Sequence, residues 1–191
     1  MADAPKPAGV RASIAVGLAV VVGAVGGHTY HVLHPPPPDI AVSTAVVRFS
    51  PRGGCTDMVV SELDRASHEV LVQAYSFTSD PIGAALIRAK SRGVAVQVIL
   101  DRSQRDGVGS ETRKLAAVLP VFIDAQHSIA HNKVMILDGT TVITGSFNFT
   151  NQAEARNAEN LIVLRSQALA RSYRDNWLAH QAHSEPMPLA P

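Results

Sequence analysis

The sequence predicts an α/β fold: a single domain with a mixed β-sheet and helices on both faces of the sheet. Three observations support this prediction. Apolar, β-branched runs alternate with segments that carry helix-capping residues. A strand–helix–strand unit spans residues 69–101, so its two strands should be parallel. A hairpin signal at Asp138-Gly139 then adds antiparallel strands, which makes the sheet mixed.

The expected strands are short apolar runs that end at turn residues. The run at 69–77 is mostly apolar, as is typical of a strand buried on both faces. Pro51 and the two glycines at 53–54 end the first strand. In order, we expect strands at residues 40–49, 69–77, 94–101, 121–123, 131–137, 140–144 and 159–165.

The expected helices are recognised by their ends. The clearest covers residues 78–93: Ser79 or Asp80 can cap it, Pro81 lies near its first turn and Gly93 lies at its end. The others are expected to begin at Thr56 or Asp57, at Ser110, at Asn151 with Glu154 as a capping box, and at Gln167, the last running to about His183.

Composition restricts the class of protein. The chain has 191 residues, of which 46% are hydrophobic, enough for one domain with a sizeable core. A formal net charge of +1 argues against a strongly basic protein that coats nucleic acid, although it allows a local basic cleft. The single cysteine, Cys55, cannot form an intrachain disulfide. We expect it to be a small buried residue, with intermolecular pairing as the alternative.

Residues 1–27 have the features of an export signal. Lys6 and Arg11 precede a 16-residue apolar run, and Ala24 and Gly26 offer a cleavage site. The run is shorter than the ~20 residues that span a bilayer. We therefore expect a signal peptide and a periplasmic or secreted protein, with an uncleaved N-terminal membrane anchor as the alternative.

Residues 28–39 are expected to be a Pro-rich linker, since four consecutive prolines make a stiff, extended spacer. His28, His31 and His34 recur at every third position. We interpret them as solvated linker residues, with a metal site as the alternative.

The remaining chain is divided into a catalytic domain, residues 40–183, and a tail, residues 184–191. Outside the linker, no His or Cys cluster has the spacing of metal ligands along the sequence, so no metal is expected. His127 is interpreted as a loop residue without a role.

The segment HNKVMILDGTTVITGSFNFT, residues 131–150, places four polar side chains where they can converge. His131 and Lys133 are two apart on a strand, so they point the same way, and Ser146 and Asn148 share this spacing. His131 opens its strand and Ser146 ends the next, which brings both to one edge of the sheet.

These residue types suit a phosphodiester, which is anionic and very slow to hydrolyse unaided. Lys133 can neutralise phosphoryl oxygens, and Ser146 and Asn148 can donate hydrogen bonds to them. A neutral ring nitrogen of His131 can attack phosphorus and form a phosphohistidine.

The pattern His131-x-Lys133, Asp138 and Gly145-Ser146-x-Asn148 resembles the HKD motif of the phospholipase D superfamily. The stretches AYSFTSDPIGAAL and GSFNFTNQAEARNAEN are similar to the small, single-motif bacterial endonucleases of that superfamily, and the likeness runs from about residue 46 to residue 177. The resemblance implies a phospholipase D-like fold and a metal-independent phosphodiesterase without a cofactor.

The resemblance also suggests roles for three further residues. Glu159 is a candidate to orient the His131 ring by accepting from its Nδ1–H, although it could simply begin a strand. Asp138 is expected to be structural, bonding amides of its turn, despite its place in the motif. Gly145 is expected to be structural as well.

Longer members of the superfamily carry two motifs and this chain carries one, so the resemblance implies a homodimer in which two copies of His131 face each other. The expected substrate is nucleic acid, DNA with RNA as a second candidate, cleaved with little sequence preference. The alternatives are a phospholipase D or cardiolipin hydrolase acting on phospholipid, and a phosphate-backbone binding module without turnover.

Overall fold

The computed structural model describes residues 40–107 and 109–188. The predictions for residues 1–27 and for the linker, residues 28–39, therefore concern residues outside the described part of the chain. No helix among the described residues has the length and apolar character needed to cross a membrane.

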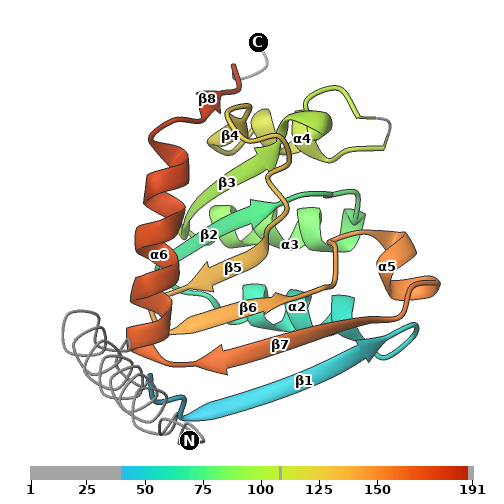
Figure 1. Cartoon of the computed structure of the whole chain (residues 1–191), viewed down its shortest axis with the longest axis vertical. Helices are drawn as coiled ribbons and strands as arrows, with labels where there is room; N and C mark the ends of the chain where they lie inside the picture. Colours follow the sequence, from blue (N-terminus) through green and yellow to red (C-terminus); the bar gives the residue numbers. More distant parts are fainter. Residues whose placement is uncertain (1–39, 108, 189–191) are drawn as a thin grey trace, which may run out of the picture. The chain divides into compact units, whose positions relative to one another are not determined.

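The described chain forms one eight-stranded sheet (Figure 1). The strands are β1 (Thr44–Ser50), β2 (Glu69–Ala74), β3 (Ala95–Asp101), β4 (Val121–Asp124), β5 (Lys133–Leu137), β6 (Thr141–Gly145), β7 (Glu159–Arg165) and β8 (Glu185–Pro186). Their order across the sheet is β1-β7-β6-β5-β2-β3-β4-β8. β2, β3 and β4 are parallel and the other pairs are antiparallel, which confirms the mixed sheet.

Helices cover both faces of this sheet, as predicted (Figure 1). The helices are α2 (Cys55–Arg65), α3 (Asp80–Ser91), the 3-10 helix η1 (Arg102–Gln104), α4 (Thr112–Ala116), α5 (Asn151–Ala155) and α6 (Gln167–Gln181). Leu63 of α2 and Leu86 of α3 pack in one buried cluster with Met135. Trp177 of α6 packs in a second cluster with Ile136, the neighbour of Met135 on β5. Because successive strand residues face opposite sides, α6 lies on the face opposite α2 and α3.

Several element boundaries differ from those predicted, because tertiary contacts decide them. The first strand begins at Thr44, four residues later than expected, and β5 begins at Lys133, which leaves His131 in the loop before the strand. The segment predicted as a tail contains β8, in which Glu185 pairs with Ile123 of β4. A two-residue strand is too short to leave a pattern in the sequence.

The predicted caps of α2 and α5 were wrong. Neither Thr56 nor Asp57 caps α2, whose N-cap position is taken by Gly54 without a side-chain cap. The Glu154 carboxylate caps α2 instead: it accepts from the backbone N–H groups of Gly54, at 3.1 Å, and Thr56, at 2.7 Å. Glu154 is thus not part of a capping box on α5, where Thr150 accepts from the N–H of Ala153 at 3.0 Å.

Cys55, the first residue of α2, is fully buried, as predicted. Burial, with a smaller contribution from the nearby Glu154 carboxylate, raises the pKa of its thiol to about 11. The thiol is therefore protonated and enclosed at neutral pH, so the alternative of intermolecular pairing is not supported.

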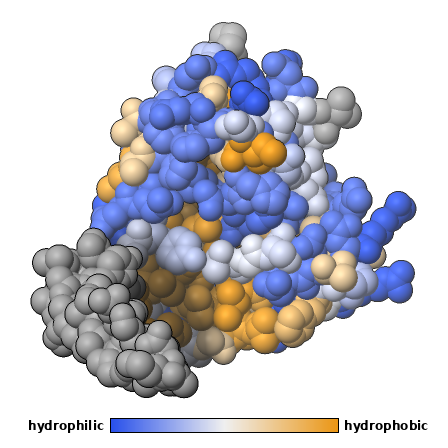
Figure 2. All heavy atoms as spheres, viewed as in Figure 1, coloured by the Kyte–Doolittle hydropathy of each residue, from blue (hydrophilic) through white to orange (hydrophobic). Residues whose placement is uncertain are grey.

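The edge strand β1 exposes apolar side chains, among them Val46, Val47 and Phe49, the last with 63% of its surface accessible. Figure 2 shows apolar residues gathered along this lower part of the molecule, whereas hydrophilic residues dominate the upper part. Exposed apolar side chains on an edge strand usually mark surface that another segment or molecule covers.

Candidate active site

The predicted site residues lie at one edge of the sheet. Gly145 at the end of β6 pairs with Leu161 near the start of β7, and Lys133 opens β5, the antiparallel neighbour of β6. The start of β5, the end of β6 and the start of β7 therefore meet at the same edge. His131 lies two residues before β5, Ser146 and Asn148 follow β6, and Glu159 is the first residue of β7. The structure thus brings together segments that are up to 28 residues apart in the sequence.

The Tyr75 ring lies beside both His131 and Lys133. The rings of Tyr75 and His131 are 4.5 Å apart between centroids, and the Lys133 Nζ lies 5.2 Å from the centre of the same tyrosine ring. Lys133 also donates a hydrogen bond to the backbone carbonyl of His131 at 3.0 Å. The two side chains therefore lie on the same side, as predicted, although His131 is outside the strand. Sequence analysis assigned Tyr75 no role, because it is one more aromatic residue in the strand expected at residues 69–77.

Lys133 and His131 differ sharply in exposure. Lys133 is 7% exposed, whereas His131 is exposed. Burial lowers the pKa of the Lys133 amine, and the Glu159 carboxylate partly opposes this shift. A cation held in partly desolvated surroundings interacts strongly with an added anion. The site thus pairs a preorganised positive charge with an accessible imidazole.

Ser146 and Asn148 retain hydrogen-bonding capacity. The Ser146 Oγ accepts from the backbone N–H of Asn160 at 3.1 Å and from its side-chain amide at 3.3 Å, so its own O–H remains available as a donor. The side-chain oxygen of Asn148 is buried and has no hydrogen-bond partner among the described residues. An amide oxygen only accepts hydrogen bonds, so the NH₂ group of the same side chain is the part of Asn148 that can donate to a phosphoryl oxygen.

The backbone at Gly145 favours glycine. Its φ of 145° is in the region that favours glycine, and an added Cβ would lie 2.3 Å from the backbone oxygen of Asn160. This close approach lets the N–H groups of Ser146 and Phe147 both donate to that oxygen, each at 3.1 Å. A larger residue would move the segment that carries Ser146 and Asn148.

Asp138 is also structural, but it binds a different loop from the one expected. Its φ of 51° forms the hairpin turn with Gly139, while its carboxylate accepts from the backbone N–H groups of Ser67, His68 and Glu69, the shortest bond being 2.8 Å. Burial alone would raise the pKa of this carboxyl, but the hydrogen bonds from these residues outweigh burial and lower it. Asp138 therefore fixes the α2–β2 loop to the turn that follows β5.

Replacing Asp138 by asparagine is expected to lower the free energy of unfolding by on the order of 2 kcal/mol at neutral pH, because charge-assisted hydrogen bonds are lost. The folded-state pKa lies below the unfolded value of ~3.9, so this stabilisation is present above pH ~4 and is lost as pH falls through the folded-state pKa. Urea titrations at pH 7 and pH 3 measure both effects. Asp106→Asn, whose side chain is 74% exposed, is the matched control. An equal loss at both pH values would contradict this account.

Glu159 is close enough to Lys133 to affect its pKa, but its carboxylate accepts a hydrogen bond from the side chain of Asn157, at 3.1 Å. No hydrogen bond joins Glu159 to His131 within the described part of one chain. The orienting role of Glu159 stays a prediction.

Sequence reasoning missed a second group of polar residues. His127 lies in a loop, as predicted, but its imidazole contacts Asp124, and His180 and His183 approach the same carboxylate. Sequence analysis found no further cluster with ligand spacing because these residues are divided between two distant segments, which the fold brings together. The signal in the sequence was two pairs three residues apart, Asp124 with His127 and His180 with His183.

Comparison with known proteins agrees with the fold. The family described as "Cardiolipin synthase, PLD-like domain" matches residues 59–180. A protein of Rickettsia bellii named phospholipase D is 39% identical over 188 residues, which cover 90% of this chain and 94% of the relative. A mitochondrial cardiolipin hydrolase of Xenopus tropicalis is 31% identical over 114 residues, which cover 59% of this chain and 54% of the relative.

A solved structure of a phospholipase D family member has the same fold. The crystal structure of Nuc from Salmonella typhimurium, a phospholipase D family member, aligns with a TM-score of 0.74 and 36% identity, covering 76% of this chain and 98% of Nuc. The mixed sheet flanked by helices and these relatives define a class of enzymes that hydrolyse phosphodiesters. The chain belongs to the phospholipase D superfamily.

Proposed function

We propose that this protein is a metal-independent phosphodiesterase that cleaves nucleic acid with little sequence preference and acts as a homodimer. The observation that carries the proposal is the buried Lys133 amine beside the exposed imidazole of His131. A fixed cation suits one phosphoryl group, and an accessible imidazole suits attack on its phosphorus.

In the proposed mechanism, a neutral ring nitrogen of His131 attacks phosphorus and displaces one ester oxygen, giving a phosphohistidine. Lys133, the Ser146 hydroxyl and the Asn148 amide stabilise the charge on the phosphoryl oxygens. Water then attacks the phosphorus, and the nitrogen–phosphorus bond breaks to regenerate the imidazole. A second proton carrier must protonate the leaving oxygen and later activate that water.

The second proton carrier is the reason for proposing a homodimer, because each chain has one motif. A two-fold axis brings a residue close to its own copy, so the second His131 can protonate the leaving group while the first attacks. Light scattering combined with activity measured over serial dilution tests this: specific activity should fall as the dimer dissociates. A monomer that is fully active at high dilution would refute the dimeric mechanism.

Exposed arginines at the same sheet edge favour a polyanionic substrate. Arg52 follows β1 beyond Ser50, which pairs with Glu159, and Arg156 lies three residues before Glu159. Among the described residues, neither arginine forms an ion pair. Unpaired guanidinium groups beside a phosphate site can contact the neighbouring phosphates of a nucleic-acid backbone, which carry no sequence information.

Phospholipid is the second candidate substrate, and the relatives named phospholipase D and cardiolipin hydrolase favour it. Their sites hydrolyse a diester of the same chemistry, so the motif by itself does not separate the two. If the apolar N-terminal segment is retained as an anchor, it would place the site beside a membrane. If it is cleaved as a signal peptide, we propose a periplasmic or secreted enzyme, which N-terminal sequencing of the exported protein would test.

The test is a parallel assay of the purified protein in EDTA on plasmid DNA, RNA and vesicles that contain cardiolipin and phosphatidylcholine. We expect nicked or linear plasmid, with activity retained in EDTA. The double variant Arg52→Gln/Arg156→Gln should weaken DNA binding and reduce the salt dependence of binding by about two ion contacts. Hydrolysis of vesicles alone would overturn the choice of nucleic acid, and binding of DNA without turnover of any diester would favour a binding module.

A further inference from the structure

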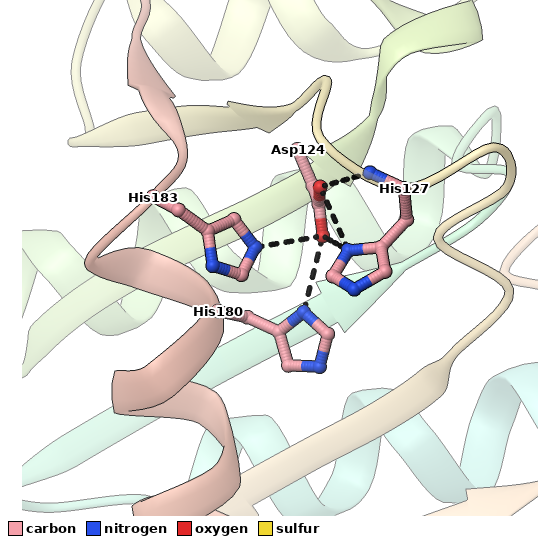
Figure 3. Close-up of side chains that lie close together, drawn as sticks. All are labelled: Asp124, His127, His180 and His183. Atoms are coloured by element: carbon pink, nitrogen blue, oxygen red, sulfur yellow. Dashed lines mark hydrogen bonds and ion pairs between the residues drawn. The ribbon is translucent and has the colours of Figure 1, made fainter.

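One buried carboxylate is surrounded by three imidazoles, outside the candidate active site (Figure 3). Asp124 ends β4 and its side chain is fully buried, while His127 lies in the loop that follows. His180 lies in the last turn of α6, and His183 lies two residues beyond its end. The side chains of His127, His180 and His183 are 44%, 17% and 26% exposed, so the group is open to solvent on one side.

The nitrogen atoms of the three imidazoles converge on the carboxylate. The Asp124 Oδ2 lies 3.0 Å from the His127 Nδ1, 3.1 Å from the His180 Nδ1 and 3.5 Å from the His183 Nε2. One ligand atom from each of the four residues lies within 4.8 Å of all the others. A tetrahedral ion with bonds of about 2.0–2.1 Å holds neighbouring ligand atoms about 3.3 Å apart. Small movements of the side chains would therefore complete such a site.

Hydrogen bonds to Asp124 do not fully explain why three imidazoles surround this carboxylate. The other oxygen of Asp124 already accepts from the backbone N–H groups of Gln126, at 3.2 Å, and His127, at 3.3 Å. All three imidazoles approach Oδ2, which offers about two lone pairs, and the His127 Nδ1 also lies 3.2 Å from the other oxygen. The ring centroids are 5.0 to 5.3 Å apart, so three imidazoles crowd one carboxylate. A divalent cation among them would accept a lone pair from each neutral ring and from the carboxylate.

We propose that Asp124, His127, His180 and His183 bind one divalent transition-metal ion of the zinc class. Three imidazoles and one carboxylate match the donors that Zn²⁺ accepts, whereas Ca²⁺ and Mg²⁺ prefer oxygen ligands. Four protein ligands leave no open position in a tetrahedral site, so the ion is structural.

The ion would tie the C-terminal helix to the loop that delivers His131. The loop between β4 and β5, residues 125–132, contains both His127 and His131. A second buried carboxylate already holds it, because Asp101 accepts from the backbone N–H of Ala130 at 2.7 Å. A metal bound by Asp124 and His127 would fix His127, which lies four residues before His131. A small displacement of His131 would alter the geometry of its attack on phosphorus.

The proposed ion is separate from the phosphate site. β4 and β5 are three strand spacings apart in the sheet, which places Asp124 about 14 Å from Lys133. The ion therefore takes no part in the chemical step, and the proposal does not depend on the proposed substrate. The relevant measurements are metal content and thermal stability, which can succeed or fail independently of activity.

The experiment uses the full chain without an affinity tag, with His28, His31 and His34 replaced by alanine so that the N-terminal histidines do not bind metal. The protein is stripped with a strong chelator and titrated with ZnCl₂, and bound zinc is counted by mass spectrometry. We expect one zinc ion per chain and a rise in Tm of about 5–10 °C. The stripped chain should remain folded, in line with the activity expected in EDTA, so that the rise in Tm on adding ZnCl₂ reports binding of the ion.

Two variants with partly exposed side chains, His127→Gln and His183→Gln, should each weaken zinc binding by at least about 10-fold while the circular dichroism spectrum is retained. The control is His68→Gln, an exposed histidine outside the cluster, which should bind zinc as the parent does. The proposal is wrong if the starting chain, with His28, His31 and His34 replaced by alanine, binds less than about 0.2 zinc ions. It is also wrong if the two variants bind zinc as tightly as the control does. In either case the cluster is held by hydrogen bonds alone.

Discussion

Replacing His131 by alanine is expected to lower the rate of phosphodiester hydrolysis by about 10⁴-fold or more, because the variant loses both the nucleophile and the proton carrier. The exposed ring packs against Tyr75 and fills no part of the core, so the variant should fold normally. Binding of uncleaved DNA should change by less than roughly 3-fold, since cations supply most of the affinity for the phosphate backbone.

The measurement is single-turnover cleavage of an end-labelled duplex, with binding followed by fluorescence anisotropy. His68→Ala is the matched control, because it removes an exposed imidazole that lies away from the site. Acid quenching of the wild-type reaction should trap acid-labile phosphate on the peptide that contains His131. If His131→Ala cleaves at the rate of the control, or if the trapped phosphate maps to another peptide, the proposed nucleophile is wrong.

Replacing Lys133 by methionine is expected to lower the rate by about 10²–10³-fold while raising the free energy of unfolding. The loss of rate follows from removing the cation that faces the phosphoryl oxygens. The gain in stability follows from burial, which lowers the pKa of the Lys133 amine despite the opposing Glu159 carboxylate. Holding a charged amine at this place opposes folding below the folded-state pKa, and this cost disappears as pH rises through that pKa.

Thermal melts and pH–rate profiles test both parts of this prediction. The wild-type rate should decline on the alkaline side below the ordinary lysine pKa of ~10.4, because the Lys133 amine loses its proton earlier than a free lysine. Lys90→Met, which removes an exposed lysine of α3, should change neither quantity. A Lys133→Met protein that is clearly less stable than wild type would show that the amine contributes more through its bond to the His131 carbonyl than its burial costs.

Much of the fold could be predicted because local signals and the final structure agree. The βαβ unit at residues 69–101, the Asp138-Gly139 turn and the strand at Glu159–Arg165 are all present. Each combines a clear hydrophobic period with turn or cap residues, and tertiary contacts reinforce these local preferences. The prediction for α2 failed because its cap, Glu154, is about 100 residues away, and the prediction for α5 failed because Thr150 and Asn151 could each serve as the cap.

The candidate site could be predicted for a different reason. His131, Lys133, Ser146 and Asn148 lie on or within three residues of two strands that are joined by a tight turn, so their spacing along the chain largely fixes their spacing at the sheet edge. Tyr75 directly follows β2, which pairs with β5 but precedes it by more than 50 residues, and nothing in the neighbouring sequence marks Tyr75. The same distance along the chain separates Asp124 and His127 from His180 and His183.

The sequence by itself determined the order of strands and helices, the hairpin and the four polar groups of the HKD motif, because short-range geometry along the chain specifies them. Only the tertiary structure decided that Glu154 caps a helix about 100 residues away, that Asp138 holds the loop after α2, and that three imidazoles converge on Asp124. The physical reason is that a side chain's partner across the fold depends on how the elements pack, and a single sequence carries no local record of that packing.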